Sequence, residues 1–227
     1  MKIIKSKKII FVAITVTIII CLGMTIVLYK YFDNQSDIKL HLSEGNIAVK
    51  YIQASKSSTI RPNMKEILQS EVWQNENLTF FSGVIQSVQN IKIKMDDDIS
   101  YNAIVDIQVL DCIRGNLEEG ASISALTGCS VRLDEIWQED SLVNSSMMKG
   151  EEGIFLIRKY DNTDTLEYDN STLYLTDIAE YGFPDAMRYS FIQEKDGEIR
   201  YCKELYNDLD APRTLSDIKQ FIKSKIL

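Results

Sequence analysis

The chain has 227 residues, of which 45% are hydrophobic and 26% charged, and its formal net charge at pH 7 is −8. This composition suffices for one folded domain of moderate size with an apolar core. All 33 acidic residues and all but four of the 25 basic residues lie from Lys30 onward, so this part carries a charge of −12. Nucleic-acid binding needs a clustered basic face, and the composition therefore argues against a nucleic-acid partner.

The N-terminus has the pattern of a membrane anchor. Residues 9–29 carry no charge, and a helix of this length, at about 1.5 Å per residue, reaches roughly 30 Å, the thickness of a bilayer core. Residues 1–8 hold four lysines and no acid, which favours the cytoplasmic side for this end. We therefore predict a cytoplasmic tail at 1–8, a single-pass signal-anchor in the cell membrane at 9–29, and an extracellular remainder.

Two other interpretations of the apolar segment remain open. A cleaved signal peptide could use Cys21 and Gly23 as the small residues before the cut, but the apolar run continues past Gly23 and exceeds the usual length of a signal-peptide core. Lipid attachment at Cys21 is the second alternative. It conflicts with the bulky Ile20, which stands where a small residue is expected.

Residues 30–61 are polar on average and are predicted to be a stalk before an exported domain at 62–227. Two short alternating pieces, "IKLHL" and "IAVKYI", suggest that the stalk lays one element on the domain, as a hairpin or as the start of a helix. A helix is predicted at 63–73, because Asn63 and Glu66 have capping spacing and an apolar face follows.

From Leu78 onward the apolar period changes to two residues, which predicts strands at 78–88 and 101–110. In the second strand one apolar row is expected from Tyr101, Ala103, Val105, Ile107 and Val109. Further strands are predicted within 109–126, 151–161, 171–182 and 187–205, and six or more short strands favour a small antiparallel barrel or sandwich. The chain should end in a helix at 214–227, capped by Thr214, with a core-facing stripe of Leu215, Ile218, Phe221 and Ile222.

Several of these pieces together resemble a known family. The strand "FFSGVIQSV", a turn at Arg114 and Gly115 in "VLDCIRGN", and "MKGEEGIFLIRK", with Lys149, Gly150 and Glu151 before a buried strand, are similar to exported OB-fold domains of bacterial surface proteins. These are distant relatives of the netrin module and the tissue inhibitors of metalloproteinases. The resemblance implies a mainly β fold, an OB-like antiparallel β-barrel at about 76–203 with flanking helices. The protease inhibition of the animal relatives is not implied, because it requires a free N-terminal cysteine.

Three cysteines remain once Cys21 is assigned to the membrane. Cys112 and Cys129 flank one predicted hairpin, and a bridge between them would stabilise the fold by about 3 kcal/mol. We predict this pairing, with Cys202 unpaired. Three buried thiols that act as small apolar side chains are the alternative.

Catalytic patterns are sparse in the sequence. The single histidine, His41, lies in the predicted stalk, and a zinc site with two imidazoles is excluded. Paired carboxylates could hydrolyse glycosides, but sequence does not fix their separation. The run Asp96, Asp97 and Asp98 could bind calcium through clustered oxygens, although it lacks EF-hand spacing and also suits a solvated hairpin tip.

The loop from Arg132 to Lys149 is the predicted binding element, because it is long and mixes apolar side chains with acids. Its candidate contact residues are Trp137, Leu142, Met147 and Met148. We expect a non-catalytic, membrane-anchored binding module without a cofactor, whose partner is a surface protein, a peptide or a glycan. The alternative is a carboxylate-dependent hydrolase of cell-wall or matrix polymer.

Overall fold

A computed structural model describes residues 37–52, 69–128, 142–209 and 211–226. The chain divides into two units, Met1–Asp37 and Ile38–Leu227, and the second carries the fold. The predicted anchor at 9–29 lies outside the described residues, within which no helix is long and apolar enough to cross a membrane. The compact unit begins at Ile38 and not at residue 62, because the second piece of the predicted stalk is a strand of the main sheet.

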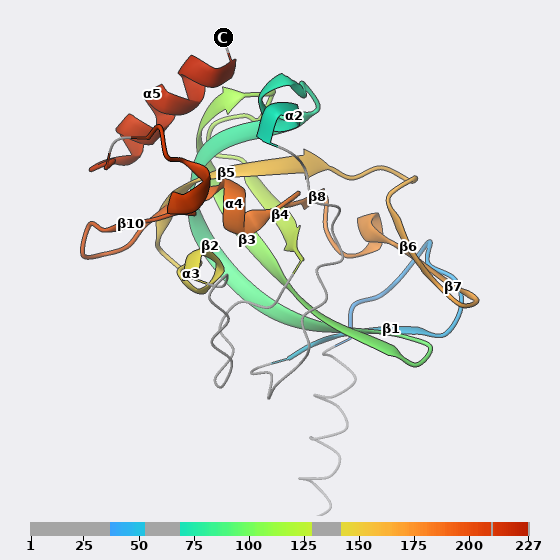
Figure 1. The fold of residues 1–227 in the computed structure, drawn as a ribbon. Coiled ribbons are helices and arrows are strands. Elements are labelled where there is room, and N and C mark those ends of the chain that lie inside the picture. Colours follow the sequence, from blue (N-terminus) through green and yellow to red (C-terminus); the bar gives the residue numbers. More distant parts are fainter. Residues whose placement is uncertain (1–36, 53–68, 129–141, 210, 227) are drawn as a thin grey trace, which may run out of the picture. The chain divides into compact units, whose positions relative to one another are not determined.

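The protein is mainly β, and its described residues form one mixed sheet of eight strands and a separate hairpin (Figure 1). The order in the sheet is β1-β2-β3-β4-β8-β5-β9-β10. The bounds of these strands are β1 Ile47–Tyr51, β2 Leu78–Met95, β3 Asp98–Arg114, β4 Ser122–Thr127, β5 Glu152–Lys159, β8 Tyr181–Gly182, β9 Ser190–Gln193 and β10 Ile199–Arg200, and the hairpin comprises β6 Thr165–Tyr168 and β7 Ser171–Tyr174.

Five strands of the sheet close into a ring. The strand β2 pairs with β3 on one side and with β5 on the other, and β8 joins β4 to β5. In chain order the ring strands are β2, β3, β4, β5 and β8. The fourth of them, β5, returns to lie beside the first, β2, which is the Greek-key arrangement. The expectation of a purely antiparallel sheet was wrong, because β4 and β8 run parallel. A parallel pair needs a long connection, and the chain from Gly128 to Glu180 provides it.

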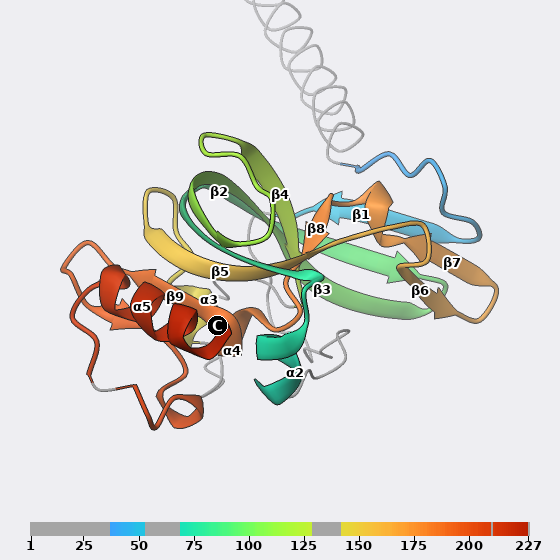
Figure 2. The same ribbon diagram turned by 90° about the horizontal axis from the view of Figure 1, so that it is seen from above.

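The hairpin of β2 and β3 is longer than the sequence indicated. The predicted strands at 78–88 and 101–110 are confirmed, but pairing continues to Met95 and Asp98, so the expected acidic loop is a tight turn. Asp96 adopts a left-handed backbone conformation with φ of 50°, which a short polar side chain tolerates. The hairpin therefore extends well beyond the ring, with β1 along its edge (Figures 1 and 2).

The helices are short except for the last. Their bounds are α2 Gln69–Gln74, α3 Leu142–Ser145, α4 Ala186–Tyr189 and α5 Leu215–Ile226, with 3₁₀ turns η2 Leu175–Asp177 and η3 Lys203–Leu205. The predicted cap of the C-terminal helix is confirmed: the Thr214 hydroxyl accepts from the Asp217 amide, and the Asp217 carboxylate accepts from the Thr214 amide. In contrast, α4 occupies residues predicted as a strand, because Asp185 caps the Arg188 amide and starts a helical turn.

Three hydrophobic clusters form the core. The first lies inside the ring and includes Ala103, Val105, Ile107 and Val109, so these four members of the predicted row are confirmed. The second joins β5 and β9 to the inner stripe of α5. The third joins the outer face of the long hairpin to β1 and to β7, and α5 and the β6–β7 hairpin consequently lie at opposite ends of the sheet (Figure 2).

Arg114 links the start of β2 to the preceding helix. Its guanidinium donates to the carbonyl oxygens of Leu78, Trp73 and Val72 at 3.0, 3.1 and 3.0 Å. The carbonyls at the end of α2 would otherwise lack intrahelical partners. Partial burial lowers the pKa of the guanidinium, which remains charged near neutrality.

Tyr160 is packed against the strand that closes the ring. A Cβ atom added to Gly182 would lie 1.9 Å from the tyrosine hydroxyl, so only glycine fits at this position. The Tyr160 ring is 5% exposed, and no hydrogen-bond partner of its hydroxyl is found among the described residues. Burial of this phenol raises its pKa.

We predict that Tyr160→Phe leaves the free energy of unfolding unchanged or raises it by up to about 1 kcal/mol, because a buried hydroxyl without a partner is removed. Tyr206→Phe is the matched control: its hydroxyl donates to the Arg188 carbonyl at 2.8 Å, and its loss should cost about 1 kcal/mol. Urea unfolding followed by fluorescence measures both. Equal losses in the two variants would contradict the difference in hydrogen bonding.

Candidate functional site

The described part of the predicted binding loop packs inward. Trp137 lies outside the described residues, and so does the side chain of Leu142, although its backbone starts α3. Met147 is 1% exposed and belongs to the cluster inside the ring, whereas Met148 is half-buried. The prediction of Met147 as a contact residue was therefore wrong for this structure, because apolar side chains in a long loop can also fill the core.

The acidic turn of the long hairpin is tied to the β6–β7 hairpin. The Ser171 hydroxyl donates to the Asp96 carboxylate at 2.8 Å and accepts from the Asn46 amide at 2.9 Å. Asp96, Asp97 and Asp98 do not form a convergent group: among the described residues, the only three carboxylates within 4.8 Å of one another are those of Glu194, Asp196 and Glu198. The geometry gives the calcium hypothesis no support.

The three carboxylates on the β9–β10 hairpin, Glu194, Asp196 and Glu198, lie among hydrogen-bond and ion-pair partners from the same domain. Glu194 accepts from the Ser146 hydroxyl at 2.6 Å and pairs with Arg200 at 3.2 Å, and Arg200 also pairs with Glu198 at 3.0 Å. The Ser146 bond and the arginine lower the pKa of Glu194. The acids of this hairpin therefore have a structural role, because they bond to Arg200 and Ser146 and hold the two strands and the end of α3 together.

The predicted disulfide remains a prediction. Cys112 and Cys202 are free thiols, and the Cys112 sulfur lies 4.0 Å from the Phe80 carbonyl oxygen. Cys129 lies outside the described residues. The register does not favour the bridge, because Thr127 at the end of β4 pairs with Ala103, toward the opposite end of β3 from Cys112.

A polar patch occupies the outer face of the ring on β2, β3 and β4. We call it the open face and define it by Gln86, Asp106, Gln108, Ser122 and Ser124. Asp106 pairs across the strands with Ser124, and Gln108 pairs with Ser122. Gln86, Gln108 and Ser122 are exposed, while Asp106 and Ser124 are half-exposed. The Ser87 hydroxyl donates to the Asp106 carboxylate, and this bond fixes the only charge of the patch.

Sequence reasoning missed the open face. Its residues alternate with the buried row of Val105, Ile107 and Val109, so the same period of two that predicted the core also marks their outward direction. The two-residue period does not show which outward-facing residues are covered by other segments of the chain. Along β3 the outward Ile104 is buried in the third cluster, whereas Gln108 is exposed.

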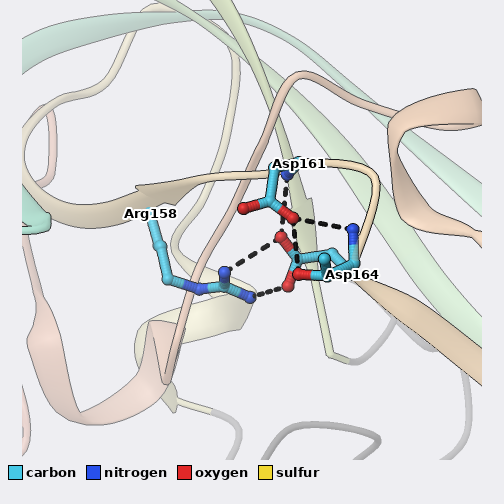
Figure 3. A network of polar contacts seen from close by, with 4 residues as sticks. Arg158, Asp161 and Asp164 are labelled. Atoms are coloured by element: carbon cyan, nitrogen blue, oxygen red, sulfur yellow. Dashed lines mark hydrogen bonds and ion pairs between the residues drawn. The ribbon is translucent and has the colours of Figure 1, made fainter.

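A second polar network surrounds the end of β5 (Figure 3). The Arg158 guanidinium donates to both carboxylate oxygens of Asp164, one bond being 3.0 Å, and Asp164 also accepts from the Asp161 amide at 2.8 Å. The Asp164 hydrogen bond raises the pKa of Arg158, and the bonds from Thr163 lower that of Asp161. The bidentate pair orients the turn into β6, which is a structural role.

Asp177 anchors the N-terminal segment of the compact unit. Its carboxylate accepts from the amides of Leu42 and Ser43 at 2.9 and 2.8 Å and from the Ser43 hydroxyl at 2.6 Å. Desolvation acts to raise the pKa of this carboxyl, but the hydrogen bonds outweigh it and the pKa is lowered. The site is a fixed anion that binds backbone amides of its own chain.

Five described carboxyl groups have pKa values below their ordinary range. Hydrogen bonds from hydroxyls, amides or a lysine are the cause in each case, and the groups concerned are Asp161, Asp177, Glu194, Asp208 and Asp217. A general acid that works near neutrality needs a raised pKa. These five carboxylates are therefore anions that hold turns and segments in place.

A scan against protein-family models finds no match to the chain, and no match is found among curated proteins either. The inference of function consequently depends on the geometry of the chain alone.

We predict that Asp177→Asn accelerates hydrogen exchange of the Leu42 and Ser43 amides roughly tenfold at pH 7, because the charged acceptor is lost. The lowered pKa of Asp177 means that its contribution is complete at neutral pH and disappears as the pH falls through a value below the ordinary 3.8. The difference between wild type and variant should therefore vanish in acid. Glu167→Gln, an exposed change on β6, is the control and should leave these amides unchanged.

Proposed function

We propose that this protein is a membrane-anchored, extracellular, non-catalytic interaction module built on an OB-like barrel. The observation that carries the proposal is the open face, an ordered and polar sheet surface that the described residues leave exposed. Sheet faces of this kind, positioned by a closed ring, serve as binding platforms in OB-folds.

The strand connectivity supports the OB-like description. Five strands close the ring in Greek-key order, and the last of them is inserted between the third and the fourth. OB-folds bind ligands on the face of their second and third strands and at two adjoining loops. In this chain those strands correspond to β3 and β4, and the loops correspond to the turn at Asp96 and the segment between β5 and β8.

The chain itself occupies part of that binding face. The two loops are joined by the bond from Ser171 to Asp96, and β1 with the residues before it packs over the hairpin between them. The part of the face that is left for a ligand is the open face, which lies farther along β3 and β4. Amides and hydroxyls there suit a surface protein, a peptide or a glycan, and the carboxylate of Asp106 disfavours a nucleic acid.

The alternative is a carboxylate-dependent hydrolase of wall or matrix polymer. The lowered pKa values of five described carboxyls make these five unsuited to the acid of such a hydrolase, which must stay protonated near neutrality. Polymer turnover that is abolished by one Asp or Glu substitution would overturn the module assignment.

We predict that protease added to intact cells removes an epitope placed at the C-terminus, because the lysines of residues 1–8 favour a cytoplasmic N-terminus. Immunoblotting measures the loss, and a cytoplasmic protein monitored in parallel should remain intact. A C-terminal epitope that is protected until the cells are lysed would contradict the extracellular assignment.

We predict that a photoreactive side chain in place of Gln108 cross-links the protein to a surface protein or glycan in living cells. Gln220 is the matched control, since it is an exposed glutamine on α5 that does not belong to the open face. Mass spectrometry of the products identifies the partner, and Ser122→Arg should abolish the Gln108 product by blocking the same patch. Identical products from both positions, or none from Gln108, would remove the open face as the binding surface.

A further inference from the structure

The far end of the long hairpin carries a basic strip on the face opposite the third hydrophobic cluster. Its composition follows from the strand register. One row across the sheet is Lys50, Lys92 and Tyr101, and the next row is Ala48, Lys94 and Ile99. Residues directly opposite in antiparallel strands point to the same face, with Cβ atoms about 5 Å apart. We call these six residues the lysine strip.

The strip is accessible. Lys94 is exposed, Ile99 is 41% exposed, and Lys92 and Tyr101 are half-buried. Their neighbours along the strands, Ile91, Ile93 and Ser100, point the other way and are buried. The hairpin is thus apolar on one side and basic, with aliphatic and aromatic neighbours, on the other.

Two lysines of the strip, Lys92 and Lys94, differ from three lysines elsewhere on the protein that form ion pairs. Lys159, Lys219 and Lys225 form ion pairs with Glu180, Asp111 and Asp208. No such pair is found for Lys92 or Lys94 among the described residues, while Lys50 has a partner of its own. Like charges directly opposite one another destabilise a sheet, so this concentration of lysine in a part with charge −12 calls for an anionic partner.

We propose that the lysine strip binds the anionic lipid surface of the membrane in which the chain is anchored. This inference depends on the anchor in the proposed function. Only residues 30–37 connect the predicted span to Ile38, and fully extended they reach roughly 30 Å, so the domain stays close to the bilayer. The Ile38 amide donates to Val49 at 2.8 Å, so the chain enters the domain beside the strand that carries Lys50.

The chemistry of the strip fits a lipid headgroup region. Each lysine near an anionic surface adds favourable electrostatic energy. Aliphatic and aromatic side chains such as Ile99 and Tyr101 favour the interface between headgroups and acyl chains. Since the rest of the domain is acidic and repelled by the same surface, the strip would orient the domain as well as hold it.

Amine acetylation of the full-length protein in lipid nanodiscs tests the proposal. Discs of phosphatidylcholine alone are compared with discs containing roughly one third phosphatidylglycerol, which supply the anionic surface. We expect acetylation of Lys92 and Lys94 to fall about threefold or more in the anionic discs and to recover in about 1 M salt, where charges are screened. Lys195 and Lys223, exposed lysines on the β9–β10 hairpin and on α5, should react equally in both discs.

Two double variants with the same change in charge complete the test. In Lys92→Glu/Lys94→Glu the protection of Lys50 by anionic lipid should disappear, whereas Lys195→Glu/Lys223→Glu should retain the protection of all three strip lysines. Equal acetylation of Lys92 and Lys94 in both discs would overturn the proposal. Protection of Lys92 and Lys94 that depends on protein concentration and not on lipid charge would also overturn it, because the strip would then bind a second copy of the chain. The anchor is tested separately by copurification with neutral discs. A protein that does not copurify with them would contradict the anchor and not the lysine strip.

Discussion

The fold depends on one strand that has three partners. The 18 residues of β2 pair with β3 along their length, with β5 at their start and with β1 at their end. The register shifts near Phe80, Ser82 and Ile85, and such bulges bend a strand so that a ring can close. Gly83 permits the close approach of β2 to β3 at this point, because an added Cβ would lie 2.7 Å from the Gln108 carbonyl oxygen. The ring, the projecting hairpin and both surfaces proposed for binding therefore share one element.

Two charged side chains join segments that are distant in the sequence. Arg114 binds the end of α2, and Asp177 binds the amides of Leu42 and Ser43. Each donor or acceptor is matched to backbone groups that would otherwise lack partners at helix ends and loops. This use of charge helps to hold together a domain with many short strands and long connections, in which the described helices other than α5 are short.

The sequence predicted the parts of the fold that follow from local rules. Alternation in 101–110 identified an inner row that includes Val105, and the spacing of Thr214 and Asp217 identified the C-terminal helix. It failed where tertiary contacts decide. The parallel pairing of β8, the inward packing of Met147 and the contacts of Arg114 all depend on segments that meet only after folding.

The same limit applies to the two surfaces. The outward direction of Gln108 is implicit in the strand period, but its exposure depends on where β7 and the N-terminal segment end. The lysine strip combines three strands, and its rows are visible only once the register of β1 against β2 is known. A net acidic composition conceals such a local basic face, because charge counts carry no positional information.

The attachment of the N-terminal segment has a mechanical consequence. If the chain is anchored as proposed, tension from the membrane would enter through Ile38 and would be borne first by its bond to Val49, then by the Asp177 contacts and the ladder of β1 on β2. The ring itself carries none of this load until the segment has detached. Detachment would uncover Ile91 and Ile93 on the hairpin and so extend the open face with an apolar surface. A pull on the proposed tether would thus add apolar surface to the polar open face before the ring unfolds.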